Sequence, residues 1–546
     1  MSILTIAYSS KVIDGKIQIS NSQGDVVTSQ EPKELLDFLA KNYTDAINRK
    51  MCWNLDTFIA PLLRILGIEI CKKLVEEPDC EALWSFTNDG IELYDISTKT
   101  KEISDGLYSL YYHRQTSFGL QVHGKWKSYF YNLSQFFEDD TEITDTQEIL
   151  AKAKELVDAF FSMGLNPLKM SSPISVYQSN VLERISSPTL ADLPSSLSEA
   201  ECDEMVEWAE QIMHREWTTS TAVGYWGEGE SFDYDLQSAY GYLFSELYDY
   251  RHATFWKSDK PIKEAHFGLL KGRVTINKDV KCSPICYKKD NGQTINPVGC
   301  SWEDILTLPE VRWIYRHKIG TFKMEYGYFW KQNAPVQPFK VPMQKIFNQR
   351  LQGGLVKKLA KRIGASAWAK CIQKSTSEGG NKFYSPLLAL QVKTNCRLQV
   401  ANFIYEHDLQ NDVLHIGTDG VRATKQVVIP ERLSMGEWKF SGSDECLILS
   451  PGRIYSPTHK PGGLYLQDII DLINKTPNET YYSTSKTRHL TLGEAVEMDD
   501  LKSVGELREF QTSIDLVASK IEQDMDFNDF PTSGGELLSK RYYGSI

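Results

Sequence analysis

The sequence contains no apolar segment long enough to cross a membrane as a helix, so we expect no membrane partner. Its first residues, Met-Ser-Ile-Leu-Thr, lack the basic start and apolar run of a signal peptide. Its ten cysteines include no Cys-x-x-Cys pair, and Cys282 and Cys286, four apart, have no second pair or histidine cluster nearby. These absences favour ordinary buried thiols over a zinc site, and they predict a reduced, cytoplasmic setting.

The chain also lacks an overall positive charge, because 60 Lys and Arg stand against 72 Asp and Glu, a net charge of −12. The charge is unevenly spread: residues 251–375 contain 24 Lys and Arg but only 8 Asp and Glu. A basic region in an acidic chain is suited to following a phosphate backbone while the rest keeps the protein soluble. A chain of 546 residues, 41% of them hydrophobic, is too long for one core. We expect about three or four ordered domains.

Two short segments far apart in the chain each deliver an aspartate near the end of an apolar, β-prone stretch. The first, residues 232–240, contains Asp235, and the second, residues 415–421, contains Asp419. Oxygen ligands without histidine or thiolate favour Mg²⁺ or Mn²⁺ over zinc. Two such carboxylates on neighbouring strands can hold two divalent cations, which is the chemistry of nucleotidyl transfer.

A basic segment lies between the two aspartates. Arg350, Lys357 and Lys361 are seven and four residues apart, close to whole helical turns, and Arg362 follows. This spacing predicts one helical stripe of cations directed at a triphosphate.

Each of these features also has a plainer interpretation. An aspartate before Ser-x-Tyr is more often a strand-end residue, Thr418-Asp-Gly420 is usually a turn, and a row of lysines is often a solvated helix face. The order of the three segments favours a shared site over three unrelated ones.

Three segments of the sequence resemble motifs of family B DNA polymerases. Asp235-Leu-Gln-Ser-Ala-Tyr240 resembles their Asp-x-x-Ser-Leu-Tyr-Pro motif, and Gly417-Thr-Asp-Gly420 resembles their Asp-Thr-Asp-Ser motif. Between them, Lys361-Arg-Ile-Gly-Ala-Ser-Ala-Trp368 resembles Lys-x-x-x-Asn-Ser-x-Tyr. The resemblance spans residues from about 150 to about 460 and is closest to the compact protein-primed polymerases of phages, linear plasmids and mobile elements. It implies an α/β (α+β) right-hand polymerase with palm, fingers and reduced thumb, preceded by a ribonuclease H-like exonuclease-type domain.

The resemblance also implies the roles of individual residues. Asp235, Asp419 and the backbone carbonyl of Leu236 are expected to hold two Mg²⁺ ions, for which Mn²⁺ can substitute. Ser238 is expected at a phosphate and Tyr240 under the sugar, where its ring excludes a ribose 2′-hydroxyl. Nucleotide binding is further expected from Arg350, Lys357 and Lys361, and DNA contact from Tyr225, Gly227, Arg453 and Tyr455.

Several positions depart from the family pattern. Gly241 stands where the family has proline, Ala365 where it has asparagine and Trp368 where it has tyrosine. Gly417 replaces the first aspartate of the last motif and Gly420 its serine. The metal-binding pair itself is intact, so we expect an active enzyme, slower or less accurate than its relatives.

The exonuclease motifs are largely missing. The opening strand reads Ala7-Tyr-Ser-Ser10 where the family has Asp-x-Glu. Asn54 and Asp56 loosely match the second motif, and Asp145 the third, although Thr141 occupies the position of its tyrosine. The leftover acids cannot hold two metals. We therefore expect no 3′–5′ proofreading, and a domain kept as a wall for the DNA.

The expected organisation is an exonuclease-like domain (1–185), a linker (186–198), palm with an insertion (199–335), fingers (336–385), palm again (386–470) and thumb (471–546). Periodicity predicts strands over 3–8, 16–20, 267–276, 320–330 and 413–417. It predicts helices over 32–42, 144–163, 198–216, 302–306 and 503–521, and an amphipathic helix over 386–406.

The expected partners are primer-template DNA and deoxynucleoside triphosphates. Residues 254–335 match in length the insertion with which protein-primed relatives contact their priming protein, which leaves a terminal priming protein open as a partner. The relatives' second insertion, which encircles DNA, has no counterpart here, because only residues 369–384 follow the lysine motif. The resemblance is consistent with a virus- or plasmid-encoded protein acting in the host cytoplasm.

Two rival functions remain at this stage. One is a catalytically weakened, polymerase-derived DNA-binding scaffold, which Ala365, Gly417 and the missing exonuclease acids favour. The other is an RNA-synthesising enzyme, which Tyr240 disfavours.

Overall fold

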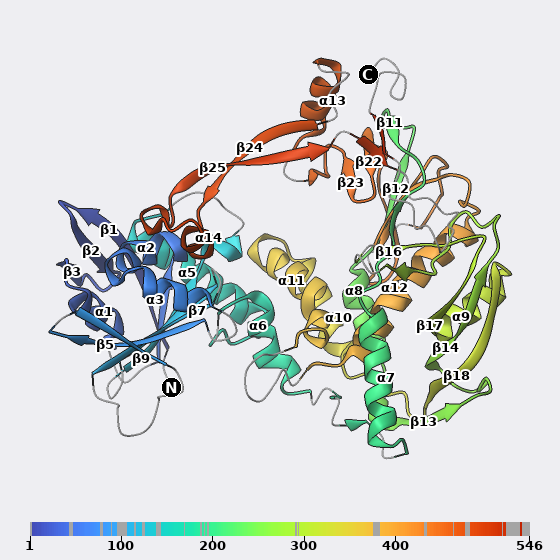
Figure 1. Cartoon of the computed structure of the whole chain (residues 1–546), viewed down its shortest axis with the longest axis horizontal. Helices are drawn as coiled ribbons and strands as arrows, with labels where there is room; N and C mark the ends of the chain where they lie inside the picture. Colours follow the sequence, from blue (N-terminus) through green and yellow to red (C-terminus); the bar gives the residue numbers. More distant parts are fainter. Residues whose placement is uncertain are drawn as a thin grey trace.

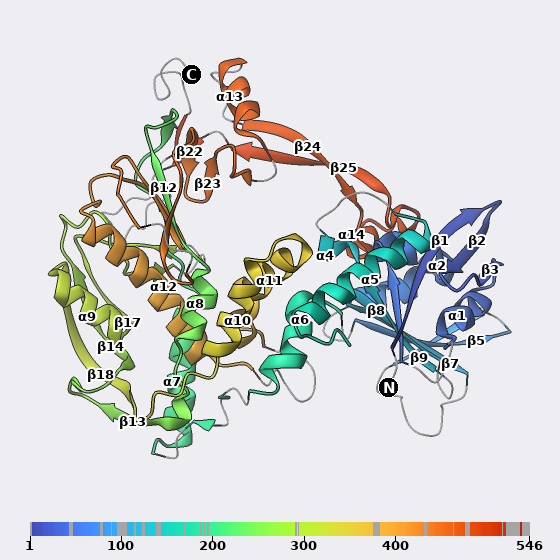
Figure 2. The same cartoon turned by 180° about the vertical axis from the view of Figure 1, so that it is seen from behind.

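The computed structural model describes residues 3–537, with gaps at 43–46, 77–79, 89, 96–105, 114–115, 123–125, 138–142, 169, 186–187, 190–191, 194–195, 290–291, 293, 375–382, 431–433, 462–463, 476–480, 516 and 520–534. An N-terminal α/β domain and a group of sheets lie on opposite sides of a central set of helices (Figures 1 and 2). No helix within the described residues is both long and apolar enough to cross a lipid bilayer.

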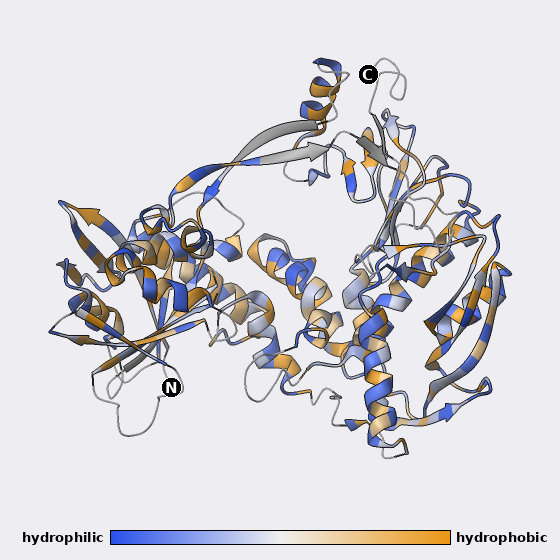
Figure 3. Ribbon diagram, viewed as in Figure 1, coloured by the Kyte–Doolittle hydropathy of each residue, from blue (hydrophilic) through white to orange (hydrophobic). Residues whose placement is uncertain are grey.

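The N-terminal domain is built on a nine-stranded sheet with the order β3-β2-β1-β4-β9-β8-β7-β5-β6. The β1–β4 and β4–β9 pairs are parallel and the remaining pairs antiparallel. Along β2 buried residues alternate with exposed or half-buried ones, so one face of the strand enters the core. Figure 3 shows the hydropathy of the residues along the chain. The strands are β1 (Ile3–Ile13), β2 (Lys16–Asn21), β3 (Val26–Ser29), β4 (Ile47–Cys52), β5 (Glu81–Thr87), β6 (Gly90–Tyr94), β7 (Leu107–His113), β8 (Ser117–Val122) and β9 (Trp126–Asn132).

Helices cover this sheet and link it to the centre of the molecule. They are α1 (Pro32–Ala40), α2 (Leu55–Leu66), α3 (Ile68–Val75), α4 (Ser134–Phe137) and α5 (Thr146–Ser162). One buried cluster extends from Phe160 of α5 through Ile363 to Leu388, so the N-terminal domain shares a core with the central helices. The central helices are α6 (Pro173–Tyr177), the π-helix η2 (Gln178–Leu182), α7 (Glu199–Ile212), α10 (Lys340–Arg350), α11 (Gly354–Ser366) and the 3₁₀-helix η5 (Ala367–Cys371).

The sheet that concerns function has five antiparallel strands in the order β10-β19-β20-β12-β21. It is formed by β10 (Thr218–Ser220), β12 (Phe232–Leu236), β19 (Val413–Gly417), β20 (Gly420–Ala423) and β21 (Trp438–Gly442), next to α8 (Ala239–Ser245) and α12 (Pro386–Glu406). A four-stranded sheet, β13 (Ala253–Ser258), β18 (Gly320–Gln332), β14 (Phe267–Ile276) and β17 (Ser301–Thr307), carries α9 (Leu308–His317). Smaller elements are η4 (Tyr250–His252) and the pair β15 (Tyr287–Lys288) and β16 (Thr294–Ile295).

The C-terminal region begins with a three-stranded sheet, β11 (Gly224–Trp226), β22 (Cys446–Ser450) and β23 (Arg453–Tyr455), on which α13 (Leu466–Lys475) packs. A long hairpin of β24 (Tyr481–His489) and β25 (Leu507–Asp515) follows, with α14 (Leu492–Glu497) and the 3₁₀-helix η7 (Leu501–Ser503) at its tip. The short strands β26 (Val517–Ser519) and β27 (Gly535–Leu537) pair with each other.

Two of the segments predicted as helices contain β-strands in the structure, because pairing with a neighbouring strand outweighs the local sequence pattern. Residues 302–306 lie in β17, which pairs with β14 along seven residues. The helix starts afterwards, where Thr307 and Glu310 form a capping box around Pro309. In the segment 503–521, β25 pairs with β24 in an unbroken nine-residue register.

Two further predictions need correction. Arg350 does not share a helix with Lys357 and Lys361, because the chain breaks at Gly353 and Gly354, which have φ of +94° and +56°. The helix over 386–406 has the predicted bounds but is not amphipathic. Its buried residues lie on all sides, because it is enclosed by α7, α8, α9 and β20. Part of the expected linker, at 186–187, 190–191 and 194–195, lies outside the described residues.

Buried ion pairs fasten α12 to its surroundings. Arg397 of α12 is 2.6 Å from Glu310 at the start of α9, and both side chains are 3% exposed. Burial alone would raise the pKa of Glu310, but Arg397 and the Thr307 hydrogen bonds hold it below its ordinary value. Arg215 and Asp304 form a second buried pair at 2.6 Å. The first pair attaches α12 to α9, and the second attaches the segment before β10 to β17 of the four-stranded sheet.

Replacing Glu310 by glutamine leaves the Arg397 charge buried without its partner, so we expect a loss of about 3–5 kcal/mol in unfolding free energy. Thermal or denaturant unfolding followed by tryptophan fluorescence measures it. The matched control is Arg273→Gln, which breaks the half-exposed Arg273–Glu303 pair and should cost less than about 1 kcal/mol. Equal losses in unfolding free energy for the two variants would show that the buried pair contributes no more to stability than the exposed pair.

Candidate active site

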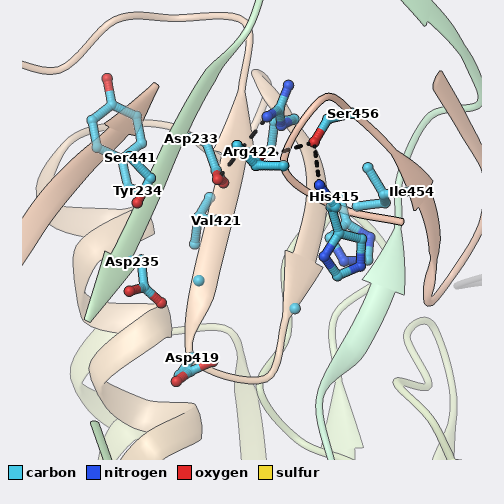
Figure 4. Close-up of a pocket in the computed structure, with 14 residues that line it drawn as sticks. Asp233, Tyr234, Asp235, His415, Asp419, Val421, Arg422, Ser441, Ile454 and Ser456 are labelled. Carbon is cyan, nitrogen blue, oxygen red and sulfur yellow. Dashed lines mark hydrogen bonds and ion pairs between the residues drawn. The ribbon is translucent and has the colours of Figure 1, made fainter. Parts of the chain in front are cut away.

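The two aspartates singled out in the sequence meet at one end of the five-stranded sheet. Asp235 lies on β12 opposite Gly420, the residue after Asp419, and the Leu236 N–H donates to the Asp419 carbonyl at 3.0 Å. Both carboxylates point toward the same end of the pocket (Figure 4). The β12–β20 pairing therefore brings residues 184 positions apart into one site.

The turn that carries Asp419 explains two departures from the family motif. Thr418 has φ of +37°, and a Cβ at Gly420 would lie 3.0 Å from the Tyr234 carbonyl oxygen. A side chain at Gly417 would start 3.1 Å from His415 Nε2. Glycine at 417 and 420 thus follows from the close approach of β12 and of His415 to the turn.

Burial and the proximity of the two carboxylates determine the electrostatics of Asp235 and Asp419. Burial, followed by the neighbouring Asp235, raises the pKa of Asp419 to about 6. Lys439 on β21 lies opposite Asp235, and its Nζ is 2.9 Å from Oδ2. An ammonium group therefore already sits where the carboxylate would take a cation. No motif in the sequence marks Lys439, because its position beside Asp235 depends on the pairing of β12 with β21.

The pocket continues from the aspartates along the β19–β20 hairpin, with a volume of about 260 Å³. Its far part contains Asp233, Arg422 and His459, with Asp233 4.0 Å from Arg422 (Figure 4). Burial, then His459 and Arg422, lowers the pKa of His415 to about 3. His415 is therefore neutral at neutral pH, where it shares a hydrogen bond with Ser220 and cannot act as a general acid.

The start of α8 places the predicted phosphate contacts together. Ser238 has φ of +52°, and its hydroxyl accepts a hydrogen bond from Arg350 Nη1 at 2.5 Å. Arg350, at the end of α10, thus reaches the site although it does not share a helix with Lys357. A Cβ at Gly241 would lie 3.2 Å from the Gly364 carbonyl oxygen of α11. A side chain at position 241 would therefore require α8 and α11 to move slightly apart, which disfavours the family's proline.

Tyr240 stacks on Trp368, with ring centroids 5.0 Å apart and an interplanar angle of 13°. The Nζ of Lys393 lies 5.7 Å from the Tyr240 centroid and 5.0 Å from that of Trp368, and it pairs with Glu216. The larger indole thus occupies the position of the family's tyrosine and fixes the plane of Tyr240. Lys393 was not found from the sequence, because no motif marks it within α12.

The basic residues of helix α11 form two groups, one in contact with the N-terminal domain and one exposed. Lys358 donates to the Phe137 carbonyl at 3.2 Å, and Arg362 donates to that of Gln135, so this face binds the N-terminal domain. Lys357 and Lys361 are exposed, and neither has an ion-pair partner within the described part of the chain. These two lysines are the free cations of the helix.

The four residues expected at DNA lie in or beside the sheet β11-β22-β23. Tyr225 OH donates to Glu445 at 2.5 Å, and the Gly227 N–H donates to Glu230 at 2.7 Å. Arg453 is partly exposed, whereas Tyr455 is 2% exposed and packs in the cluster under α13. Tyr455 therefore supports the strand that presents Arg453.

The polar residues that loosely match the exonuclease motifs make contacts within the N-terminal domain. Asn54 caps α2 and Asp145 caps α5, each accepting two backbone N–H bonds. Asp56 is 3% exposed and accepts the hydroxyl of Tyr112 at 2.7 Å. Thr141 lies outside the described residues. Within the described chain, no group of three or more His, Cys, Asp and Glu is arranged to hold a metal.

The raised pKa of Asp419 makes a stability prediction with a definite sign. The folded protein favours the protonated form, so stability falls as the pH rises from about 4, where the unfolded carboxyl ionises, to about 6, and the loss is constant above that. Without divalent cations, Asp419→Asn should raise the unfolding free energy at pH 8 by roughly 1–3 kcal/mol, with a smaller gain at pH 5.

Thermal melts in EDTA measure this gain, and added Mg²⁺ should reduce it by stabilising only the unmodified protein. Asp412→Asn, at the other end of the same hairpin, is the control and should change little. A lower melting temperature for Asp419→Asn at pH 8 would contradict the crowded-carboxylate description.

The sequence matches no protein-family model and no curated protein. The fold, however, is similar to solved structures of phi29 DNA polymerase. The complex with primer-template DNA and incoming nucleotide has a TM-score of 0.60 and 12% identity, and the match covers 95% of this chain and 99% of that one. The binary complex with primer-template DNA gives 0.57 at 10% identity, covering 94% and 99%. An orthorhombic crystal form gives 0.56 at 12%, covering 95% and 100%. Nearly the whole chain thus has a fold similar to that of phi29 DNA polymerase.

Proposed function

We propose that the protein is a template-directed DNA polymerase that adds deoxynucleotides to a primer 3′ end by two-metal nucleotidyl transfer. The observation that carries this proposal is the meeting of Asp235 and Asp419 across β12 and β20. It occurs in a chain whose fold, over nearly its full length, resembles that of phi29 DNA polymerase. The comparison supports a polymerase fold, and the carboxylate pair supports the chemistry.

The donor set fits hard divalent cations. Two carboxylates and the Leu236 carbonyl offer oxygen ligands only, and the ion pair of Asp235 with Lys439 is consistent with a charged carboxylate at this position. When bound, two Mg²⁺ ions would activate the primer 3′-hydroxyl and stabilise the displacement at the α-phosphate. Mn²⁺, which takes similar ligands, could replace them.

The remaining residues bind and orient the nucleotide. Arg350, already donating to Ser238, is placed to neutralise a triphosphate above the start of α8, and the free Lys357 and Lys361 add charge. Tyr240, held flat by Trp368, is the proposed floor under the sugar. When a cation binds Asp235, Lys439 would no longer pair with this carboxylate and could pair with a phosphate instead.

We also propose that the enzyme does not proofread. Asn54 and Asp145 are helix caps and Asp56 is bonded to Tyr112, which supports a structural use for each leftover polar group. A protein encoded by a virus or mobile element and active in the cytoplasm would fit this assignment. Nucleotide release from a single-stranded 3′ end would contradict the absence of proofreading.

Asp235→Asn and Asp419→Asn should each lower primer extension at least about 1000-fold, because each removes a proposed metal ligand. Extension of a labelled primer on a template with Mg²⁺ and deoxynucleotides measures the rate. Asp412→Asn is the control, an acid of the same hairpin outside the pocket, and should keep the full rate. No extension by the unmodified protein, together with retained DNA binding, would favour the non-catalytic scaffold.

Tyr240→Ala should lower the preference for deoxynucleotides over ribonucleotides about 10–1000-fold, because the ring that excludes the 2′-hydroxyl is lost. Single-nucleotide incorporation with each nucleotide type gives the ratio. Tyr248→Ala, at an exposed position 41% accessible, is the control. An unchanged ratio for Tyr240→Ala would remove this residue from sugar selection.

A further inference from the structure

Tyr240, the proposed floor under the sugar, lies where three elements of the chain meet. Helix α8 carries Tyr240, the 3₁₀-helix η5 carries Trp368 and α12 carries Lys393, and each of these elements contacts the other two. Helices α8 and α12 lie side by side in both views of the molecule (Figures 1 and 2). The position of Tyr240 therefore depends on side chains from segments far apart in the sequence.

Trp368 provides a fixed surface for the Tyr240 ring. The indole is buried, and its Nε1–H donates to the Ala365 carbonyl at 2.9 Å. Tyr240 is half-buried, and within the part of the chain that the structure describes its hydroxyl makes no hydrogen bond. The contacts of its ring, and not its hydroxyl, thus hold Tyr240 in place.

The ammonium group of Lys393 lies close to both rings. Its Nζ is 5.7 Å from the Tyr240 centroid and 5.0 Å from that of Trp368, within the range of about 6 Å over which a ring face attracts a cation. Lys393 is buried, so water weakens this attraction less than it would at the surface. A rotation of Tyr240 away from the stack would therefore lose the attraction to Lys393 as well as the contact with Trp368.

Glu216 holds the ammonium group from the solvent side. This residue lies between α7 and β10, and its carboxylate accepts a hydrogen bond from Lys393 Nζ. The Glu216 side chain is 52% exposed, so the carboxylate remains solvated while it supplies the counter-charge of a buried lysine. The pair fixes where the lysine charge lies relative to the two rings.

The same face of α12 contacts the turn that carries Asp419. Cys396, one helical turn after Lys393, donates its Sγ–H to the Thr418 carbonyl at 3.4 Å. Burial, followed by the neighbouring Cys396, Asp419 and Glu216, raises the pKa of Tyr240 above its ordinary value. Helix α12 thus holds the stacked rings and the catalytic turn in a fixed relation to each other.

We propose that Lys393, held by Glu216, is a positioning residue that fixes the Tyr240 ring on Trp368 and thereby sets the selection of deoxyribose over ribose. The proposal rests on the proposed function for the identity of the substrate. A ring held in one plane excludes a 2′-hydroxyl by its volume, whereas a ring that can turn leaves room for it. Lys393 needs no contact with the nucleotide in this role.

Lys393→Met tests the proposal, because it removes the charge and keeps an unbranched side chain of similar length. The half-exposed Glu216 stays solvated without its partner, so we expect the variant to fold. The ratio of kcat/KM for deoxynucleotides to kcat/KM for ribonucleotides should fall about 3–30-fold, mainly through a lower KM for ribonucleotides. Lys393→Arg, which keeps the charge, should stay within about twofold of the unmodified protein.

Single-nucleotide incorporation with each nucleotide type measures this ratio. A purely structural role of Lys393 would lower kcat/KM for both nucleotides by the same factor. An unchanged ratio in an active Lys393→Met would overturn the proposal. Glu216→Ala tests the anchoring of the lysine from a half-exposed position and should lower the ratio about 2–10-fold, even if Lys393→Met fails to fold.

The chain offers a matched control for the lysine. Lys374 pairs with Glu210 at 2.8 Å, and its Nζ lies 5.5 Å from the centroid of Tyr384. Lys374→Met therefore removes the same kind of ion pair and ring contact at a site that does not include Tyr240, and it should leave the sugar ratio unchanged. Equal changes in Lys374→Met and Lys393→Met would overturn the assignment.

Fluorine NMR follows the stack without catalysis. In protein labelled with 5-fluorotryptophan, Trp368→Phe identifies the resonance of Trp368. Lys393→Met should shift or broaden this resonance, and Lys374→Met should not. An unchanged resonance in Lys393→Met would contradict the positioning role, whether or not the protein extends primers.

The two proposals fail in different ways. No primer extension by the unmodified protein would refute the polymerase assignment. Extension with an unchanged sugar ratio in Lys393→Met would refute only the role of Lys393.

Discussion

The repulsion between Asp235 and Asp419 is the constraint on which the site depends. Two carboxylates held together by the β12–β20 pairing are unfavourable unless a cation or a proton compensates them, and Lys439 supplies one compensating charge. The surrounding fold must therefore be stable enough to hold an unfavourable arrangement. The largely buried α12, held by the Arg397–Glu310 pair, is one element that provides this rigidity. In the proposed function, divalent cations supply the remaining compensation.

The departures from the family motifs acquire physical reasons in this fold. Gly417, Gly420 and Gly241 each stand where a side chain would meet a neighbouring backbone or ring within about 3 Å. Trp368 stacks on Tyr240 in place of a smaller ring. These positions are adjustments of packing around an intact carboxylate pair, and they weaken the case for a catalytically weakened scaffold. For Ala365 nothing in the structure gives a reason.

Much of the fold could be predicted from the sequence where a local signal exists. The strand over 413–417 and the helix over 386–406 have their predicted bounds, and the resemblance to family B polymerases agrees with the fold. Predictions failed where long-range pairing decides the structure, as in β17 and β25, or where two glycines break a helix, as at Gly353 and Gly354. Lys439 and Lys393 were missed for a related reason. Their importance comes from β12 and from the Tyr240–Trp368 stack, and neither contact is visible in local spacing.

We propose that Asp235 and Asp419 together hold two divalent cations when DNA and nucleotide are bound. Bound Mn²⁺ can be counted by electron paramagnetic resonance in a complex with primer-template and a non-hydrolysable deoxynucleotide. We expect two ions per chain for the unmodified protein and the loss of at least one in Asp419→Asn. Equal ion counts in the two proteins would exclude this role of the carboxylate pair.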